Sequence, residues 1–545
     1  MKKVFLLGLT ILFTTFTASS IGNIKSGRIG NKGEIIASAK DAIVKTESGL
    51  VAGYIEDGIY IYKGIPYAAA ERFMPPTKAK TWEGIRSSRA YGPTCPQKKR
   101  MGWMIDEMAF ESRWDDGYSG EDCLRANIWT KGINDGKKRP VMVWLHGGGY
   151  SAGSGQELPA YDGTNLCEKG DLVIVSLNHR LNVLGFLNLS TFGEKYAQSG
   201  NVGLLDLIAA LQWVKDNIAS FGGDPSNVTI FGQSGGGGKV TALLTSQRAK
   251  GLFNKAIIES GSLSQMMEQK YSKRIGMTVM EELGLKASQI DQLKDIPYEK
   301  LLAAGENAVA KVKAEVTTEG TMSLLFGWCP TVDGNVLTSQ PTTPQAYESS
   351  KDIPVIIGTT LHEFMGSSRN PVLKKATMEI AKNELTKKYG DKTDEFLKAF
   401  GKAYPHYKPV DLFDVDMLFR PQAVQQATLK SNSGSAPVYM YLFTWESPIL
   451  DGTFRSSHCM ELPFVFDNIY NSRTMTGGSK STYELADKMS NAWLNFAKTG
   501  NPNVFELPDW KPFDTQKGAT MIFNNKCEIK YNHDKELLNI IDSNR

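Results

Sequence analysis

The chain has 545 residues, of which 41% are hydrophobic and 22% charged, a composition typical of soluble globular proteins. Its 62 lysines and arginines against 58 acidic residues leave a formal net charge of +4, which is too small and too evenly spread to indicate nucleic-acid binding. The length is compatible with about two to four domains or with one large α/β enzyme.

Residues 1–20 have the layout of a secretory signal peptide. Lys2 and Lys3 open the chain, residues 4–16 are apolar, and small residues follow up to Ser20, near which cleavage is expected. The alternative is a membrane anchor, but the apolar run is short for a bilayer span of about 20 residues. We therefore expect a secreted or periplasmic protein with no membrane span in the mature chain.

The rest of the chain is predicted to consist of a polar, mobile lead-in at residues 21–40 and one large domain at residues 41–545. Export permits disulfides. Cys95 and Cys123 are close in sequence and lie in polar surroundings, and a bridge between them would close a loop of about 30 residues. The remaining four cysteines are predicted to be small buried hydrophobes: Cys167, Cys329, Cys459 and Cys527. The sequence contains no CxxC motif or cysteine–histidine cluster that would indicate a metal site, and no cofactor is predicted.

Residues 141–145 form an apolar run that predicts a buried strand. His146 and three consecutive glycines, Gly147, Gly148 and Gly149, follow it. Because glycines let backbone amides approach a substrate closely, this loop is a candidate oxyanion hole. A plain flexible turn is the alternative interpretation.

Residues 227–244 join a second apolar run to a burst of glycine and a predicted helix. A P-loop requires G-x-x-x-x-G-K-[ST], but Gln233 stands at the first glycine and Val240 at the hydroxyl position. The dinucleotide-binding pattern G-x-G-x-x-G fails at Ser234 in one register and at Val240 in the other. Phosphate binding is therefore disfavoured.

The same segment fits the nucleophile motif G-x-S-x-G, with Ser234 between Gly232 and Gly236. Such a turn brings the residues two before and two after the serine almost into contact, so both must be very small. The helix that follows would direct its N-terminus at Ser234 and favour negative charge there. The amide of Gly235 would face a developing oxyanion.

A serine nucleophile needs a base and an acid, and on an α/β-hydrolase sheet the acid and then the histidine follow it in the chain. Among the four histidines after Ser234, His458 is the best candidate because a polar loop precedes it and an apolar segment follows. A hydrogen-bonded structural histidine is the alternative. Glu363 follows a short apolar run that ends at Gly358. Spacing alone leaves other acids open, although most of them lie in lysine-rich helical patterns.

These motifs match a known family. The chain resembles the type-B carboxylesterases, α/β-hydrolases that include cholinesterases and bacterial para-nitrobenzyl esterases, from about residue 43 to about residue 530. The resemblance rests on sequence blocks that occur in the family's order, among them "YKGIPYAAAERFMPP", "GEDCLRANIW", "VWLHGGGY", "GNVGLLDLIAALQWVKDNIASFGGDPSNVTIFGQSGGG", "HCMELPFVF" and "NAWLNFAKTGNPN".

The resemblance implies an α/β-hydrolase fold: a mostly parallel central sheet with helices on both faces and helical cap insertions, of which residues 264–316 would form part. It also implies a small-molecule ester substrate hydrolysed in two steps through an acyl-enzyme. The family's site residues fall on the following positions of this chain: the triad on Ser234, Glu363 and His458, the oxyanion amides on Gly148, Gly149 and Gly235, and the first disulfide on Cys95 and Cys123. Phe326 and Trp328 fall where the family lines its acyl pocket, although core aromatics would explain them equally well.

Two departures limit the resemblance. The family usually has Glu before the serine and Ala after it, whereas this chain has Gln233 and Gly235. Loss of the negative charge beside the nucleophile would remove the attraction for a quaternary-ammonium alcohol, and neither Trp103 nor Trp114 has the spacing of the choline-binding tryptophan. We therefore expect an esterase that is not a cholinesterase.

Other functions remain open at the level of sequence. A catalytically inactive binding or adhesion relative would lack a triad member, and all three are present here. A lipase would need an apolar lid, and the charged, mixed segment at residues 96–122 argues weakly against one. Within the esterases, the sequence does not choose among acetyl, feruloyl and other esters, or between plant-polymer deacylation and xenobiotic hydrolysis, and the oligomeric state is not predicted.

Overall fold

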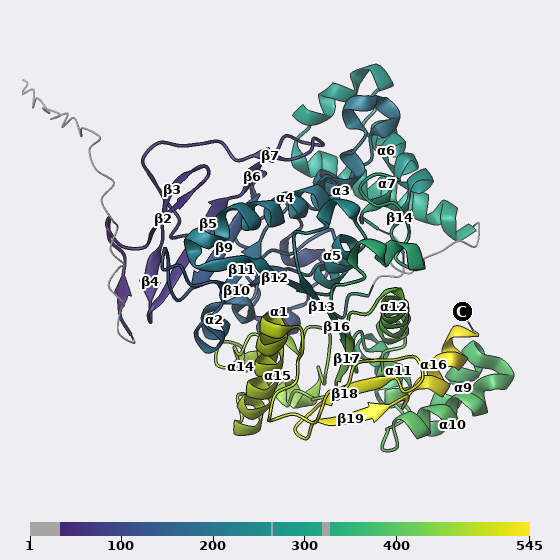
Figure 1. Cartoon of the computed structure of the whole chain (residues 1–545). Coiled ribbons are helices and arrows are strands. Elements are labelled where there is room, and N and C mark those ends of the chain that lie inside the picture. The colour runs from purple at the N-terminus through teal and green to yellow at the C-terminus, as the bar shows by residue number, and fades with distance from the viewer. Residues whose placement is uncertain (1–32, 263–264, 319–326, 545) are drawn as a thin grey trace, which may run out of the picture.

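A computed structural model describes residues 33–262, 265–318 and 327–544 and is built around a 12-stranded sheet (Figure 1). In spatial order its strands are β1 (Ile35–Ile36), β4 (Tyr54–Glu56), β5 (Ile59–Pro66), β9 (Arg125–Thr130), β11 (Val173–Leu177), β10 (Arg139–Leu145), β12 (Gly223–Gln233), β13 (Lys255–Glu259), β16 (Val355–Thr360), β17 (Val438–Phe443), β18 (Ala519–Phe523) and β19 (Glu528–Tyr531).

The middle of this sheet is parallel and its edges are antiparallel. Strands β11, β10, β12, β13, β16, β17 and β18 all run in the same direction, whereas β1, β4, β5 and β9 on one side and β19 on the other pair antiparallel. Parallel strands are buried on both faces and therefore have nearly continuous apolar sequences. The apolar runs at the two glycine motifs become β10 and β12, as predicted.

Each face of the sheet packs against its own layer of helices. In β10, Val141 and Val143 belong to the core on the side of α4 (Val202–Asn217), α5 (Gly235–Leu244) and α12 (Phe419–Ser433). Met142 and Trp144 belong to the core on the side of α2 (Thr164–Gly170), α13 (Leu462–Val465) and α15 (Lys480–Thr499). Successive strand residues point to opposite faces, so the predicted sheet with helices on both faces is confirmed.

Two groups of helices lie outside these layers. The pair α6 (Gln269–Glu282) and α7 (Tyr298–Thr318) pack on each other at the top right of Figure 1, within the region predicted to form a cap. A separate small core joins α9 (Met378–Tyr389), α10 (Thr393–Ala403) and α16 (Lys535–Asp542) at the lower right. The shorter helices are α1 (Asp106–Ser112), α3 (Asn182–Phe186), α8 (Pro371–Lys374), α11 (Asp411–Asp414) and α14 (Arg473–Thr476).

Small sheets complete the fold: β2 (Ile43–Thr46) with β3 (Gly49–Ala52) and β8 (Ile85–Ser87), β6 (Ala68–Ala69) with β7 (Thr77–Lys78), and β14 (Met267–Glu268) with β15 (Thr331–Val332). The predicted signal peptide lies outside the described residues. Part of the predicted lead-in is ordered as β1, which pairs with β4. Among the described residues, no helix is both long and apolar enough to cross a bilayer.

Candidate active site

Ser234 occupies a strained turn between β12 and α5. Its backbone has φ 59° and ψ −126°, a conformation that costs free energy for a residue with a side chain and that often marks functional sites. A Cβ on Gly232 would lie 2.6 Å from the backbone of Gly236, and a Cβ on Gly236 would lie 1.9 Å from the carbonyl oxygen of Leu145. The predicted need for glycine on both sides of the serine is therefore explained by direct backbone contact.

The glycine loop after β10 lies directly against this turn. Gly148 and Gly149 have φ of 81° and 62°, and a Cβ on Gly235 would lie 2.4 Å from the backbone nitrogen of Gly149. In the part of the chain that the structure describes, the amides of Gly148, Gly149 and Gly235 donate no hydrogen bond within the protein. Three uncommitted N–H groups beside a serine can stabilise an oxyanion.

Glu363 and His458 are brought together by two loops that pair with each other. His362 and Ser457 form a parallel β-bridge, and the His458 amide donates to the Glu363 carbonyl oxygen at 3.0 Å. The His458 Nδ1 atom lies 2.5 Å from Glu363 Oε2, while Glu363 Oε1 accepts a hydrogen bond of 2.9 Å from the Thr360 amide. The Glu363 side chain is fully buried. This geometry places the proton on Nδ1 and leaves Nε2 as the basic nitrogen.

The His458 ring is held between an amide and aromatic rings. Gln233 Nε2 lies 3.3 Å from His458 Nε2 and 3.4 Å from Nδ1. An atom nearly equidistant from both nitrogens lies over the ring face, so this is a stacking contact rather than an in-plane hydrogen bond. The Phe364 ring lies 4.5 Å from the imidazole, measured between centroids, and the Phe419 ring 5.7 Å.

The structure does not join Ser234 directly to His458. Among the described residues, no hydrogen bond links the Ser234 hydroxyl to the imidazole, and the side chain of the adjacent Gln233 contacts the ring instead. Catalytic hydrogen bonds are often long in enzymes without substrate.

Two carboxyl groups whose pKa values respond to Glu363 were missed from the sequence. Asp416 accepts hydrogen bonds from amides at the start of α12. Burial, and next the charge of Glu363, raise its pKa to about 7. Burial raises the pKa of Glu461 well above its usual value, with further contributions from Glu259 and Glu363. The sequence places Asp416 just before a helix, which indicates a helix-capping residue. It gives no indication that Asp416 lies near Glu363.

The predicted disulfide is not formed. All six cysteines are free thiols in the structure. Cys95 and Cys123 are nevertheless neighbours in the core, since a hydrogen bond between them, together with burial, raises the pKa of the Cys123 thiol well above its usual value. The pairing of the two cysteines therefore stays a prediction, and what the structure supports is their contact.

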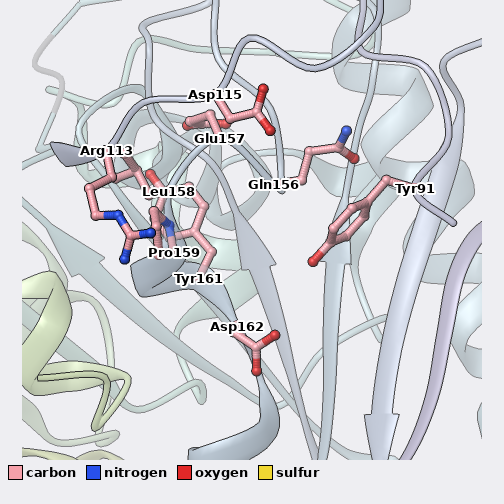
Figure 2. A pocket seen from close by; sticks show the side chains of 9 residues that line it. All are labelled: Tyr91, Arg113, Asp115, Gln156, Glu157, Leu158, Pro159, Tyr161 and Asp162. Atoms are coloured by element: carbon pink, nitrogen blue, oxygen red, sulfur yellow. The ribbon is translucent and has the colours of Figure 1, made fainter. Parts of the chain in front are cut away.

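Two cavities lie on segments that follow the glycine loop in the chain, and neither is lined by Ser234, Glu363, His458 or the glycines at 148, 149 and 235. One, of about 330 Å³, is bounded by Ser151 and Ala152 just after the oxyanion loop, by α7 and by Trp328. Trp328 is half-buried there, which is consistent with a pocket wall, whereas Phe326 lies outside the described residues. The second cavity, of about 300 Å³, is lined by both polar and apolar groups and includes Glu157 and Tyr161 (Figure 2). In the described ranges, no three potential metal ligands cluster.

Comparisons with known proteins identify the family of the chain. Residues 40–540 match the model of the carboxylesterase family. The chain is 35% identical to the para-nitrobenzyl esterase of Bacillus subtilis (strain 168), over 91% of this chain and 97% of the relative. It is 32% identical to the fumonisin B1 esterase of Sphingopyxis macrogoltabida, over 88% of this chain and 86% of the relative.

Solved structures are similar over nearly the whole chain. An esterase from Clostridium hathewayi, described as able to hydrolyse aliphatic aromatic polyesters, superimposes with a TM-score of 0.81 at 34% identity, covering 94% of this chain and 100% of that one. A Geobacillus stearothermophilus carboxylesterase gives a TM-score of 0.73 at 33% identity, covering 91% and 99%. The chain therefore belongs to the carboxylesterase family of ester hydrolases and has its α/β-hydrolase fold.

Proposed function

We propose that this protein is a secreted serine carboxylic-ester hydrolase that works through an acyl-enzyme on Ser234. The observation that carries the proposal is the Glu363–His458 pair, with Nδ1 and Oε2 2.5 Å apart, next to a serine in a strained turn at the head of α5. A buried carboxylate that fixes the histidine tautomer is what a serine nucleophile requires from its partners.

The proposed chemistry has two steps. His458 Nε2 takes the proton of the Ser234 hydroxyl while Oγ bonds to the ester carbonyl carbon, and the carbonyl electron pair moves onto oxygen. The amides of Gly148, Gly149 and Gly235 stabilise this oxyanion, each donor contributing about 10²–10³ in rate. The C–O bond to the alcohol then breaks as His458 protonates the leaving oxygen, and a water molecule releases the acid by the same route.

The substrate is proposed to be an uncharged ester. The side chain of Gln233 that contacts the His458 ring is a neutral amide rather than a carboxylate. At this position the part of the site that would bind the alcohol group of the ester therefore has no fixed negative charge to attract a cation. The cavity of about 330 Å³ beside Trp328 is large enough for a medium-sized acyl group. The named activities of the relatives, on para-nitrobenzyl esters and on polyesters, are compatible with such a substrate.

A lipase remains a second candidate because of one observation. The segment at residues 96–122, which the sequence indicated to be charged and mixed, exposes four large apolar or aromatic side chains: Trp103, Ile105, Phe110 and Tyr118. Exposed apolar groups can favour an oil–water interface. Emulsified tributyrin hydrolysed much faster than dissolved tributyrin would favour the lipase, and equal rates would favour the esterase.

Export is proposed from the signal-like residues 1–20. In an oxidising compartment the neighbouring thiols of Cys95 and Cys123 could then be oxidised to a disulfide. N-terminal sequencing of the mature protein, together with a count of free thiols in denaturant without reductant, tests both points: a start near residue 21 and four free thiols are expected.

The experiment that tests the main proposal is hydrolysis of para-nitrophenyl esters, acetyl through octanoyl plus feruloyl, by the wild type and by Ser234→Ala. The wild type should hydrolyse at least one ester and the variant none above background. Equal activity of the two proteins would refute the role of Ser234. The acyl-length profile of the wild type measures the size of the pocket.

A further inference from the structure

Lys239 is a fully buried lysine that packs against the glycine loop of the candidate active site. It lies on α5, five positions after Ser234, and none of its surface is exposed. Burial lowers its pKa to about 7, and the opposing influence of Glu157 is smaller. Burying an ammonium group is costly unless its hydrogen bonds are satisfied. The mechanism proposed above does not use this side chain, so its place in the core calls for an explanation.

The Lys239 side chain binds the backbone of the oxyanion loop from beneath. Its Nζ donates to the carbonyl oxygen of His146 at 2.7 Å and to that of Gly147 at 3.4 Å. The Gly147 oxygen is also approached by the Nδ1 atom of His146 at 2.9 Å. Lys239 therefore binds the His146 carbonyl closely and the Gly147 carbonyl more weakly, and the Gly147 carbonyl has its shorter contact with the His146 ring.

This contact reaches the oxyanion amides through one peptide unit. In a trans peptide the C=O and N–H bonds point in opposite directions. When the Gly147 carbonyl points down to Lys239, the Gly148 N–H in the same peptide unit must point away from the core. A donor on the carbonyl also polarises the unit and strengthens the N–H as a hydrogen-bond donor.

Other charged and titratable groups around Lys239 leave its role intact. Burial, followed by the charge of Lys239, lowers the pKa of both His146 and His179, so these rings stay neutral. Glu157 is buried, and the Ser154 amide donates to its carboxyl group. Glu157 also lines the cavity of Figure 2. Whether charged or neutral, the lysine keeps N–H donors for the two carbonyls.

We propose that Lys239 is a positioning residue that holds the loop at residues 146–149 in place and strengthens the Gly148 amide as an oxyanion donor. The inference rests on the proposed function, because it assigns Lys239 to the stabilisation of the oxyanion on the Ser234 adduct. The proposal predicts that removing the Lys239 amine lowers the affinity of the enzyme for the transition state more than it lowers the stability of the folded protein.

Lys430 provides a matched control. This lysine on α12 is also almost completely buried, donates to a backbone carbonyl, that of Lys351, at 3.1 Å, and has its pKa lowered by burial to about 8. Its partner belongs to neither the oxyanion loop nor the triad. Lys430→Met and Lys239→Met therefore remove the same chemical group from two buried sites, of which one adjoins the loop.

The experiment measures two quantities for the wild type, Lys239→Met and Lys430→Met. The first is kcat/KM on a para-nitrophenyl ester, normalised to sites titrated with an organophosphate. The second is the inhibition constant of an aryl trifluoromethyl ketone, whose carbonyl carbon bonds Ser234 Oγ while its oxygen becomes an oxyanion and the serine proton passes to His458. Lys239→Met should lose about 10- to 100-fold in both quantities, and Lys430→Met less than two-fold in either.

Each outcome decides one question. If the wild type hydrolyses no ester, the proposed function fails before Lys239 is tested. If the wild type is active and Lys239→Met stays within two-fold of it in both quantities, or if Lys430→Met loses as much, the inference is overturned. Should Lys239→Met yield no titratable sites, Lys239→Gln takes its place, since its shorter, neutral side chain can satisfy at most part of the contact. Full wild-type activity and ketone affinity in Lys239→Gln would equally overturn the inference.

Discussion

The serine half of the candidate site and its acid–histidine half are held in place by different means. Around Ser234, backbones touch directly, and a Cβ on Gly236 would lie 1.9 Å from the Leu145 carbonyl oxygen. Glu363 and His458 are 95 residues apart and meet through hydrogen bonds between two loops. The serine half depends on steric contacts within a short segment, which a short motif can encode. The acid–histidine half depends on the central sheet, because the sheet aligns the two loops that carry Glu363 and His458.

Glu363→Gln should have the largest effect and should act on the acid–histidine half alone. Gln Oε1 can keep the Thr360 amide, but the side-chain NH₂ would then face His458 Nδ1. The imidazole must then carry its proton on Nε2, the nitrogen that should accept the serine proton. We expect kcat to fall by about 10³–10⁴ with little change in melting temperature.

Steady-state kinetics and thermal melts of purified Glu363→Gln test this expectation. Glu379→Gln, on the exposed side of α9, serves as the control and should behave as the wild type. A Glu363→Gln enzyme within ten-fold of wild-type kcat would show that Glu363 does not set the tautomer of His458.

Gly236→Ala tests the serine half. Because the new methyl group would overlap the Leu145 carbonyl oxygen, β10 and α5 must separate, and the oxyanion loop and the nucleophile must move with them. Displacements of about 1 Å cost on the order of 10²-fold in rate, so activity should fall at least that far, together with a lower melting temperature. In Gly401→Ala on α10 the added Cβ meets its nearest neighbour at an ordinary 3.4 Å, and both properties should be retained.

Gly235→Ala introduces the residue that the family usually has, at a position where this structure has no room for it. The Cβ would lie 2.2 Å from the carbonyl oxygen of Gly149 and 2.4 Å from its nitrogen. We expect the loop to shift and kcat/KM to fall about 10-fold, since the donors remain but are misaligned. Unchanged kcat/KM and unchanged affinity for a trifluoromethyl ketone would show that the loop adjusts freely.

This division also accounts for what could be predicted from the sequence. The elbow at Ser234 and the glycine loop at Gly148 follow from short motifs whose steric reason is local, and both lie where the motifs placed them. Glu363 could not be chosen from spacing alone, because its contact with His458 depends on loops aligned by β16 and β17, and the family resemblance was needed to select it. The stacking of Gln233 on His458 and the packing of Asp416 near Glu363 arise only in three dimensions.

The smallest predicted effect concerns Glu259, which lies beneath Ser234. Its carbonyl accepts the Ser234 amide at 2.8 Å, and its buried Oε1 accepts a hydrogen bond from Trp493 Nε1 at 2.7 Å. Burial raises its pKa from 4.5 to about 8. Between these two values the unfolded chain has released a proton that the folded protein keeps, so the stability that this group contributes falls as pH rises through that window.

Glu259→Gln removes this titration while its amide oxygen can still accept from Trp493. The melting temperature of the variant relative to the wild type should therefore be nearly unchanged at pH 5 and should rise progressively to pH 8, by about 2 °C or more. Melts at four pH values across that window measure the slope. A difference that is flat with pH would mean that Glu259 is ionised in the folded protein, and the layer beneath Ser234 would then contain a charge that its surroundings must stabilise.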